Sequence, residues 1–396
     1  MLTNKKRISN NSEKYLILMQ PEEKFPPMLN TQRFTFMEII LLCKKTNRIF
    51  VLPEILSQPR DNKIAESGET NHKKFVLGEI FIPMGHFFNI ELLNNYVKTI
   101  SFKDFIKISK NHISKLYCFD HHFSNKVNIY NHTFYCDKTL NPKNLKDVFN
   151  NDEPFIAISG YKPGKYLVKS FPSWPKNFKK KYWEITKHIQ YNKSLIQKAE
   201  KFIEKNNLKN YLAIHWRRGD RVHPEVSELA EQIISDESEM KKRIDLFLIK
   251  PALKIMKKYK LNKVFLATNS GTKWHLEYLK SKLPIVQYPA SGKWKYREEE
   301  GIIEQILCIK SDYFFAAPFH YEQCSNFSRW IIDFRIISGK GKMISHQLKM
   351  QSSVVLARMH LIKEKILLRI RPLLKKILPI KLQKIFTPIY VWLKSK

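Results

Sequence analysis

Short apolar runs alternate with helical periodicity at the start of the chain. Residues 15–19 are a continuous apolar run ended by a Gln-Pro pair, which is typical of a buried strand. Apolar residues at helical spacing predict a helix over 31–45, and a second apolar run at 48–52 is stopped by Pro53. Strand, helix and strand at this spacing predict a βαβ unit with parallel strands. A ligand site is then expected at the carboxyl end of the first strand.

The same alternation returns after residue 210, whereas the order of strands and helices over 75–205 cannot be assigned from the pattern. The charged stretch 200–207 is interpreted as a connecting segment between two halves. Strict alternation in the second half predicts another parallel sheet. Strands are expected at 211–214, 263–267, 284–286 and 312–316, and helices at 236–259, 274–280, 298–310 and 327–337.

Length and composition divide the chain. With 396 residues and 43% hydrophobic residues, two packed domains are the natural expectation, since one domain usually spans about 100–200 residues. The pattern places them at 1–205 and 206–345. Residues 346–396 differ in kind and predict a basic amphipathic helical tail.

The tail carries a concentrated positive charge. Residues 358–396 hold eleven Lys or Arg against one Glu, interleaved with apolar residues at helical spacing. This pattern is typical of a helix lying in an anionic membrane interface. A helix docked on the protein, with lysine stems reaching outward, is the alternative interpretation.

The formal net charge of +34 makes polyanions and phosphate-bearing substrates candidate partners, although a Lys-, Asn- and Ile-rich composition contributes to it. The first 14 residues show no apolar targeting segment, and no apolar run reaches 18 residues. We therefore expect a cytoplasmic protein, peripheral on the inner membrane face through its tail, with the secretory pathway as the alternative. The five cysteines are scattered and are interpreted as buried free thiols.

The segment His215-Trp216-Arg217-Arg218-Gly219-Asp220 directly follows a predicted strand. Open α/β sheets bind ligands at that strand end. The planar guanidinium of arginine gives a phosphate two parallel charge-assisted hydrogen bonds, and Gly219 permits a tight bend beside a ligand. The segment therefore predicts a phosphate-binding site. No pattern of metal ligands stands out in the sequence.

This His-x-Arg-Arg-x-Asp segment is similar to the motif of the GDP-fucose fucosyltransferase superfamily, which includes the α1,2-, α1,6- and protein O-fucosyltransferases. The segments 29–33, 47–53, 82–93 and 264–270 also resemble the family's motifs in the same order. So do Asp312 and the stretch from Cys324 to Arg335. The resemblance covers roughly residues 15–340. It implies a GT-B-like fold, in which two Rossmann-like domains face each other across a cleft.

The resemblance also implies roles for individual residues. Arg217 would bind the β-phosphate of GDP-fucose and stabilise the charge on departing GDP, and Asn30 would face the sugar and acceptor from the opposite domain. The implied reaction is inverting transfer of fucose to a hydroxyl of a glycan, lipid-linked glycan or protein, without a divalent metal or another cofactor. The residues implied to contact the nucleotide or to shape its site are His215, Arg218, Asp220, Asp312, Ser325, Phe327 and Ser328.

Two departures from the family pattern bear on the chemistry. Pro27 stands where some relatives have a glutamate general base, and Asn269 replaces the usual aspartate of its motif. The general base therefore stays unassigned. Two other interpretations stay open: a transferase of the same fold that uses another sugar nucleotide, and a basic scaffold that binds nucleic acid or membrane without catalysis.

Overall fold

The computed structural model describes most of the two predicted halves. The described residues are 13–19, 29–57, 80–118, 126–130, 132–140, 152–159, 178–216, 237–268, 273–289, 297–316, 326–340 and 344–345. The tail predicted at 346–396 lies outside them, as do Arg217, Arg218, Asp220 and Ser325.

The first half forms a sheet of parallel strands with one antiparallel edge strand, β7. β1 pairs with β2 on one side and with β9 on the other, so the predicted βαβ unit is confirmed. A separate antiparallel pair, β3 (Glu54–Ser57) and β4 (Ile80–Pro83), follows β2. In spatial order the sheet contains β5 (Thr99–Ile100), β2 (Ile49–Val51), β1 (Tyr15–Leu18), β9 (Phe155–Ser159), β6 (His112–Cys118), β8 (His132–Leu140) and β7 (Lys126–Ile129).

The helices of this half include two that sequence patterns did not resolve, α7 and α8. The segment 200–207, interpreted above as a connection, instead supplies the last turns of α8, so that interpretation is wrong. Leu195 and Ala199 repeat at a helical interval and are buried, and Asn192 caps the helix through Ser194 N. The helices are α1 (Leu29–Thr46), η2 (Met84–His86), α3 (Ile90–Asn94), α4 (Phe102–Ser109), α7 (Phe178–Thr186) and α8 (Lys193–Lys205).

The second half forms the predicted parallel sheet, and every strand and helix expected after residue 210 is present. In spatial order its strands are β12 (Ile285–Val286), β11 (Lys263–Thr268), β10 (Tyr211–Trp216), β13 (Tyr313–Ala316) and β14 (Ile344–Ser345). Its helices are α10 (Glu237–Ile244), η3 (Asp245–Ile249), α11 (Lys250–Tyr259), α12 (Lys273–Lys282), α13 (Arg297–Lys310) and α14 (Asn326–Ile337).

One long helical stretch, α10 to α11, contains a π-helical turn at η3. Pro251 lies one turn after Phe247. Because proline has no N–H to donate and its ring crowds the carbonyl four residues earlier, the ordinary helical bond fails there. The chain therefore widens by one residue and continues.

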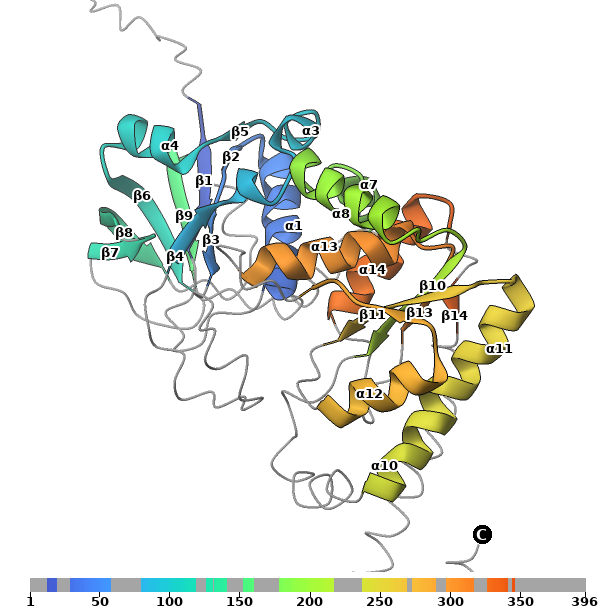
Figure 1. The fold of residues 1–396 in the computed structure, drawn as a ribbon. Helices are drawn as coiled ribbons and strands as arrows, with labels where there is room; N and C mark the ends of the chain where they lie inside the picture. Colours follow the sequence, from blue (N-terminus) through green and yellow to red (C-terminus); the bar gives the residue numbers. More distant parts are fainter. Residues whose placement is uncertain are drawn as a thin grey trace, which may run out of the picture.

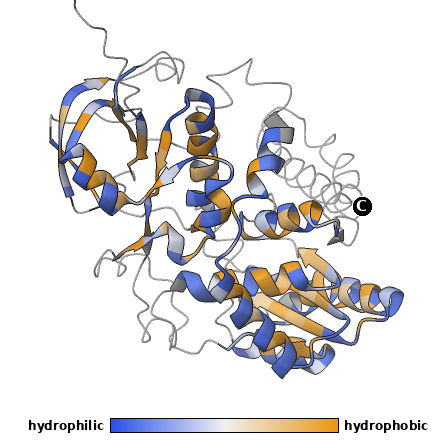
Figure 2. Cartoon of the chain, turned by 90° about the horizontal axis from the view of Figure 1, so that it is seen from above, coloured by the Kyte–Doolittle hydropathy of each residue, from blue (hydrophilic) through white to orange (hydrophobic). Residues whose placement is uncertain are grey.

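Five helices lie between the two sheets: α1 and α7 from the first half, α13 and α14 from the second, and α8 against α13 (Figure 1). One hydrophobic cluster runs through them, from Leu16 of β1 to Trp330 of α14 and Phe314 of β13. The strands of the second sheet are mostly hydrophobic, whereas the outer surfaces of its helices are mostly hydrophilic (Figure 2). The halves therefore share a core.

The four described cysteines are buried and free, as expected from their scatter along the sequence. Cys324 lies outside the described residues. Among the helices that the structure describes, none has both the length and the apolar character needed to cross a membrane.

A hydrogen bond to a titratable group, the carboxyl of Asp333, joins the first half to α14. The Tyr182 hydroxyl of α7 donates to Asp333 Oδ2 over 2.7 Å. Burial raises the pKa of Asp333 from 3.8 to about 6, although this hydrogen bond and Arg329 act against the shift. A carboxyl group with a raised pKa in the folded state destabilises the fold once the unfolded chain has ionised.

We therefore expect Asp333→Asn to stabilise the protein at pH 8, by up to about 3 kcal/mol. The amide oxygen still accepts from Tyr182, whereas the buried charge is gone. The free energy of unfolding of the wild type should fall as pH rises from about 4 to 6, and the variant should lack this pH-dependent decrease. Urea unfolding from pH 4 to 8 measures it. A difference between the two proteins that is equal at pH 4 and pH 8 would contradict the assignment.

Candidate functional site

His215 lies at the carboxyl end of β10, the central strand of the second sheet, beside Ala267 and Ala316 of the flanking strands. Its Nδ1 lies 2.6 Å from Ser328 Oγ, and its ring stacks on Phe327 at 4.3 Å between centroids. Both partners belong to the first turn of α14. The strand end and the helix N-terminus therefore meet, and the positive end of the α14 dipole favours an anion there.

Gln305 of α13 connects this strand end to the first half. Its side chain is 1% exposed and its amide group makes four hydrogen bonds. Oε1 accepts from Tyr191 Oη at 2.6 Å and Arg33 Nη1 at 3.2 Å. Nε2 donates to Asn30 Oδ1 at 2.9 Å and to the Phe327 carbonyl at 3.1 Å. The whole hydrogen-bonding capacity of the amide is used, so its orientation is determined.

Asn30, in the first turn of α1, is held by this arrangement. Its Oδ1 accepts from both Gln305 and Arg33, the latter at 3.2 Å, and Trp330 Nε1 donates to its backbone carbonyl at 3.2 Å. Two donors occupy the carbonyl oxygen of the amide, so the Nδ2 end points away from them. Asn30 thus presents two N–H donors in a defined direction.

Arg33 is a fully buried cation in a box of aromatic rings. Its guanidinium carbon lies 4.4 Å from the ring centre of Trp330, 4.5 Å from Tyr191 and 5.0 Å from Phe88. Burial lowers its pKa, against the opposing effect of Tyr191. Its Nε and Nη2 have no hydrogen-bond partner among the described residues. Ring faces stabilise the charge where hydrogen bonds do not, so the surroundings stay electropositive.

The structure therefore brings together four of the predicted site residues: Asn30, His215, Phe327 and Ser328. Arg217, Arg218, Asp220 and Ser325 lie outside the described residues. Arg217 and Arg218 nevertheless directly follow the last residue of β10, and Ser325 precedes α14 by one residue.

Asp312 does not fit its predicted contact with the nucleoside. It precedes β13, and its Oδ2 accepts from Tyr211 N, at the first residue of β10, over 2.9 Å. His215 lies four residues further along that parallel strand, about 13 Å away. Asp312 therefore belongs to the amino end of the sheet, where Arg335 Nη2 donates to its carbonyl.

Sequence reasoning missed Gln305, Arg33, Tyr191 and Trp330. A signal existed for Gln305, which interrupts the apolar stripe of Ile302, Ile303, Ile306 and Leu307 on α13. A polar side chain at a core position requires hydrogen-bond partners. The sequence alone did not show which partners they are.

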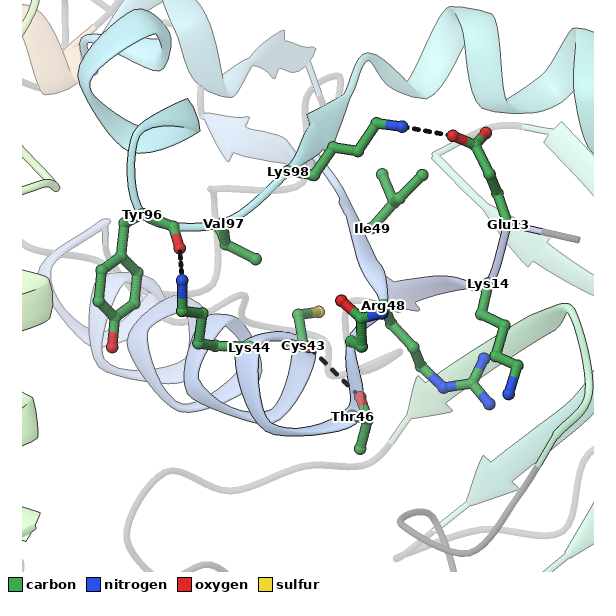
Figure 3. A pocket seen from close by; sticks show the side chains of 11 residues that line it. Glu13, Lys14, Cys43, Lys44, Thr46, Arg48, Ile49, Tyr96, Val97 and Lys98 are labelled. Carbon is green, nitrogen blue, oxygen red and sulfur yellow. Dashed lines mark hydrogen bonds and ion pairs between the residues drawn. The ribbon is translucent and has the colours of Figure 1, made fainter. Parts of the chain in front are cut away.

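A polar pocket of about 430 Å³ lies elsewhere, at the amino ends of β1, β2 and β5 (Figure 3). It borders the last turn of α1, about 24 Å along the helix axis from Asn30. Lys44 donates to the Tyr96 carbonyl, Lys98 pairs with Glu13, and Arg48 donates to a backbone carbonyl. Because these cations already have partners, we interpret the pocket as a structural feature of the sheet's amino end and not as a ligand site.

Among the described residues, no group of three or more His, Cys, Asp or Glu side chains is arranged to hold a metal ion. The donors gathered at the site are instead amides, a hydroxyl, an imidazole and a guanidinium. The Gln305 amide has made all its hydrogen bonds and Arg33 is fully buried, so the Asn30 N–H groups are the ones oriented to donate to a ligand oxygen.

Comparison with known proteins covers most of the chain. Residues 28–337 match the family described as GDP-fucose protein O-fucosyltransferase. No curated protein matches significantly. Among solved structures, POFUT1 in complex with GDP is similar, with 16% identity over 85% of this chain and 98% of that chain and a TM-score of 0.55.

Two further structures are similar at lower scores. POFUT1 in complex with GDP-fucose shares 16% identity over 84% of this chain and 97% of that chain, with a TM-score of 0.53. The fucosyltransferase NodZ from Bradyrhizobium shares 12% identity over 81% of this chain and 92% of that chain, with a TM-score of 0.40. The likeness to POFUT1 shows a common α/β fold.

We expect Gln305→Met to lower the free energy of unfolding by about 2–4 kcal/mol, because four buried or half-buried partners each lose a hydrogen bond. Gln305→Glu should lie between it and wild type, since Oε atoms still accept from Tyr191 and Arg33. Chemical denaturation measures both. Gln197→Met, on the exposed face of α8, is the matched control and should change stability little. Equal stability of the Gln305 and Gln197 variants would contradict this account.

Proposed function

The chain belongs to the GDP-fucose protein O-fucosyltransferase family and is a glycosyltransferase, and from this premise we propose its reaction. It transfers fucose from GDP-fucose to a hydroxyl group of a glycan or protein with inversion at the anomeric carbon. The observation that carries the proposal is the network of Gln305, which joins Asn30 of the first half to the His215 strand end of the second.

In this proposal the two sheets belong to a GT-B-like pair of domains, with nucleotide bound in the second and acceptor received by the first. Its support is positional. Arg217 directly follows the carboxyl end of β10, and the N-terminus of α14 meets the same strand end. Both are suitable for pyrophosphate, the arginine by its charge and the helix N-terminus by its dipole.

The chemical step would break the bond between the anomeric carbon and the β-phosphate oxygen. That electron pair leaves with GDP, the acceptor oxygen bonds to the opposite face of the carbon, and its proton passes to a base or to water. Arg217 would neutralise the charge that develops on the leaving phosphate. Asn30 would hold the sugar or the acceptor through its outward N–H groups. Arginine as counter-charge makes the reaction independent of a divalent metal.

The acceptor and the place of action are proposed on sequence grounds. A glycan, lipid-linked glycan or protein hydroxyl remains the acceptor class. A peripheral position on the inner membrane face, through residues 358–396, would suit a lipid-linked acceptor.

The donor site is tested by calorimetric titration of GDP, GDP-fucose, GDP-mannose and UDP-glucose with EDTA present. We expect GDP and GDP-fucose to bind, and Arg217→Ala to weaken both by roughly 100-fold through loss of a charge-assisted bond. Lys273→Ala is the matched control, because it removes one charge from the residues following β11, and Lys273 is 91% exposed.

Preferential binding of UDP-glucose or GDP-mannose would reassign the donor. Absence of binding by all four nucleotides would overturn the proposed donor site. Binding that EDTA abolishes and a divalent metal restores would overturn the proposed independence from metal. Equal losses in Arg217→Ala and Lys273→Ala would show that general charge, and not Arg217, attracts the nucleotide.

Asn30→Asp separates binding from chemistry. The substituted side chain still accepts from Gln305 and Arg33 but has no N–H donor. We expect GDP affinity to change little, while GDP release from GDP-fucose slows by roughly 10- to 100-fold. Product release assays and calorimetry on the same preparations measure the two. If GDP affinity and turnover fall equally, Asn30 serves the fold of the site and not the reaction.

A further inference from the structure

The outer face of α10, η3 and α11 exposes large apolar side chains in the middle of a helix. Leu246 is 55% exposed, Phe247 40% and Leu253 46%. The core-facing side of the same helix is complete without them, since Ile244, Leu248, Ile249, Ala252 and Ile255 are buried against the second sheet. The three outward residues therefore do not serve the core.

Lysines surround these apolar side chains. The exposed lysines of residues 242–260 are Lys242, Lys250, Lys254, Lys257, Lys258 and Lys260. Asp245 is the single acidic residue of this range, and the Tyr278 hydroxyl donates to its carboxylate over 2.8 Å. In the described part of the chain no ion pair involves any of the six lysines. We call residues 242–260 the α10–α11 face.

The π-helical turn contributes to this arrangement. It places Leu246 and Phe247 side by side on the outside while Leu248 and Ile249 face the core. Leu253 follows in α11 and is also exposed. The helix from α10 to α11 lies at the outer edge of the second half (Figure 1), and its exposed apolar residues and lysines make this surface basic and amphipathic.

We propose that the α10–α11 face docks on an anionic lipid bilayer. Leu246, Phe247 and Leu253 enter the boundary between headgroups and acyl chains, and the six lysines contact lipid phosphates. A helix with apolar residues flanked by lysines binds such an interface through both contributions. A nucleic acid would use the lysines but would gain nothing from exposed leucines, so the apolar residues favour lipid.

This inference does not depend on the proposed function, because it uses no residue of the donor or acceptor site. It is also independent of the tail, whose sequence at 358–396 has the same basic and apolar character. If the α10–α11 face and the tail both bind the membrane, loss of one contact can be masked by the other. A probe placed on the α10–α11 face then follows that contact alone.

The test uses the full chain and vesicles of phosphatidylcholine with or without about 30 mol % phosphatidylserine. Co-sedimentation is compared for wild type, the triple variant Leu246→Ser, Phe247→Ser and Leu253→Ser, and the control Ile108→Ser. Ile108 is 47% exposed on α4 and matches the exposure of the three apolar residues, whereas its neighbour Lys107 pairs with Asp104. We expect binding to anionic vesicles that falls roughly tenfold in the triple variant alone.

A local probe removes the ambiguity of the tail. An environment-sensitive fluorophore on Leu246→Cys should shift to shorter wavelength with anionic vesicles, and the same label on Ile108→Cys should not. Equal responses of the two labels, or wild-type binding by the triple variant, would overturn the proposal. Binding that depends on the lysines alone, and that a DNA duplex abolishes, would make the face a general polyanion surface and would also overturn it.

Discussion

The amide of Gln305 is the contact on which the candidate site depends. Its two acceptor bonds go to residues of the first half, Tyr191 and Arg33, and its two donor bonds go to Asn30 and to the carbonyl of Phe327. A neutral group with every hydrogen bond made can be buried at little cost, whereas one missing partner leaves a penalty of about 1–3 kcal/mol. Four partners from two helices, α1 and α14, and the loop before α8 must therefore be in place together, which defines how the halves meet.

Arg33 shows why this contact is built from amides and rings. A carboxylate in the position of Gln305 would pair with the guanidinium and neutralise the site. Here the charge is stabilised by the faces of Trp330, Tyr191 and Phe88, and it remains electrostatically visible to its surroundings. In the proposed reaction, the positive charge of Arg33 favours binding of an anionic donor, in addition to the contribution of Arg217.

The sequence predicts features whose pattern is local in the chain, and it does not predict contacts between residues far apart in the chain. The βαβ units and the His215 strand end were found because periodicity and motif are local. The α8 segment was misassigned because its charged residues outnumber the apolar ones that mark its buried face. Asp312 was assigned to the nucleoside through the family resemblance, although the predicted strand 312–316 already placed it at the amino end of that strand. Gln305 was missed because its partners lie 114 and more residues away, apart from Phe327, and only folding brings them together.

A shared core also restricts how a donor site of this kind can operate. Domains that hinge need an interface that water can enter without large cost. Here the contact between α1, α13 and α14 includes Arg33 and Gln305, both almost fully buried, together with Trp330. Opening it would expose apolar surface and break the hydrogen bonds that orient Asn30. The direction of the Asn30 amide is therefore set before any ligand arrives. Electrostatic stabilisation is most effective in such a case, because dipoles that are already aligned need no reorganisation as charge develops.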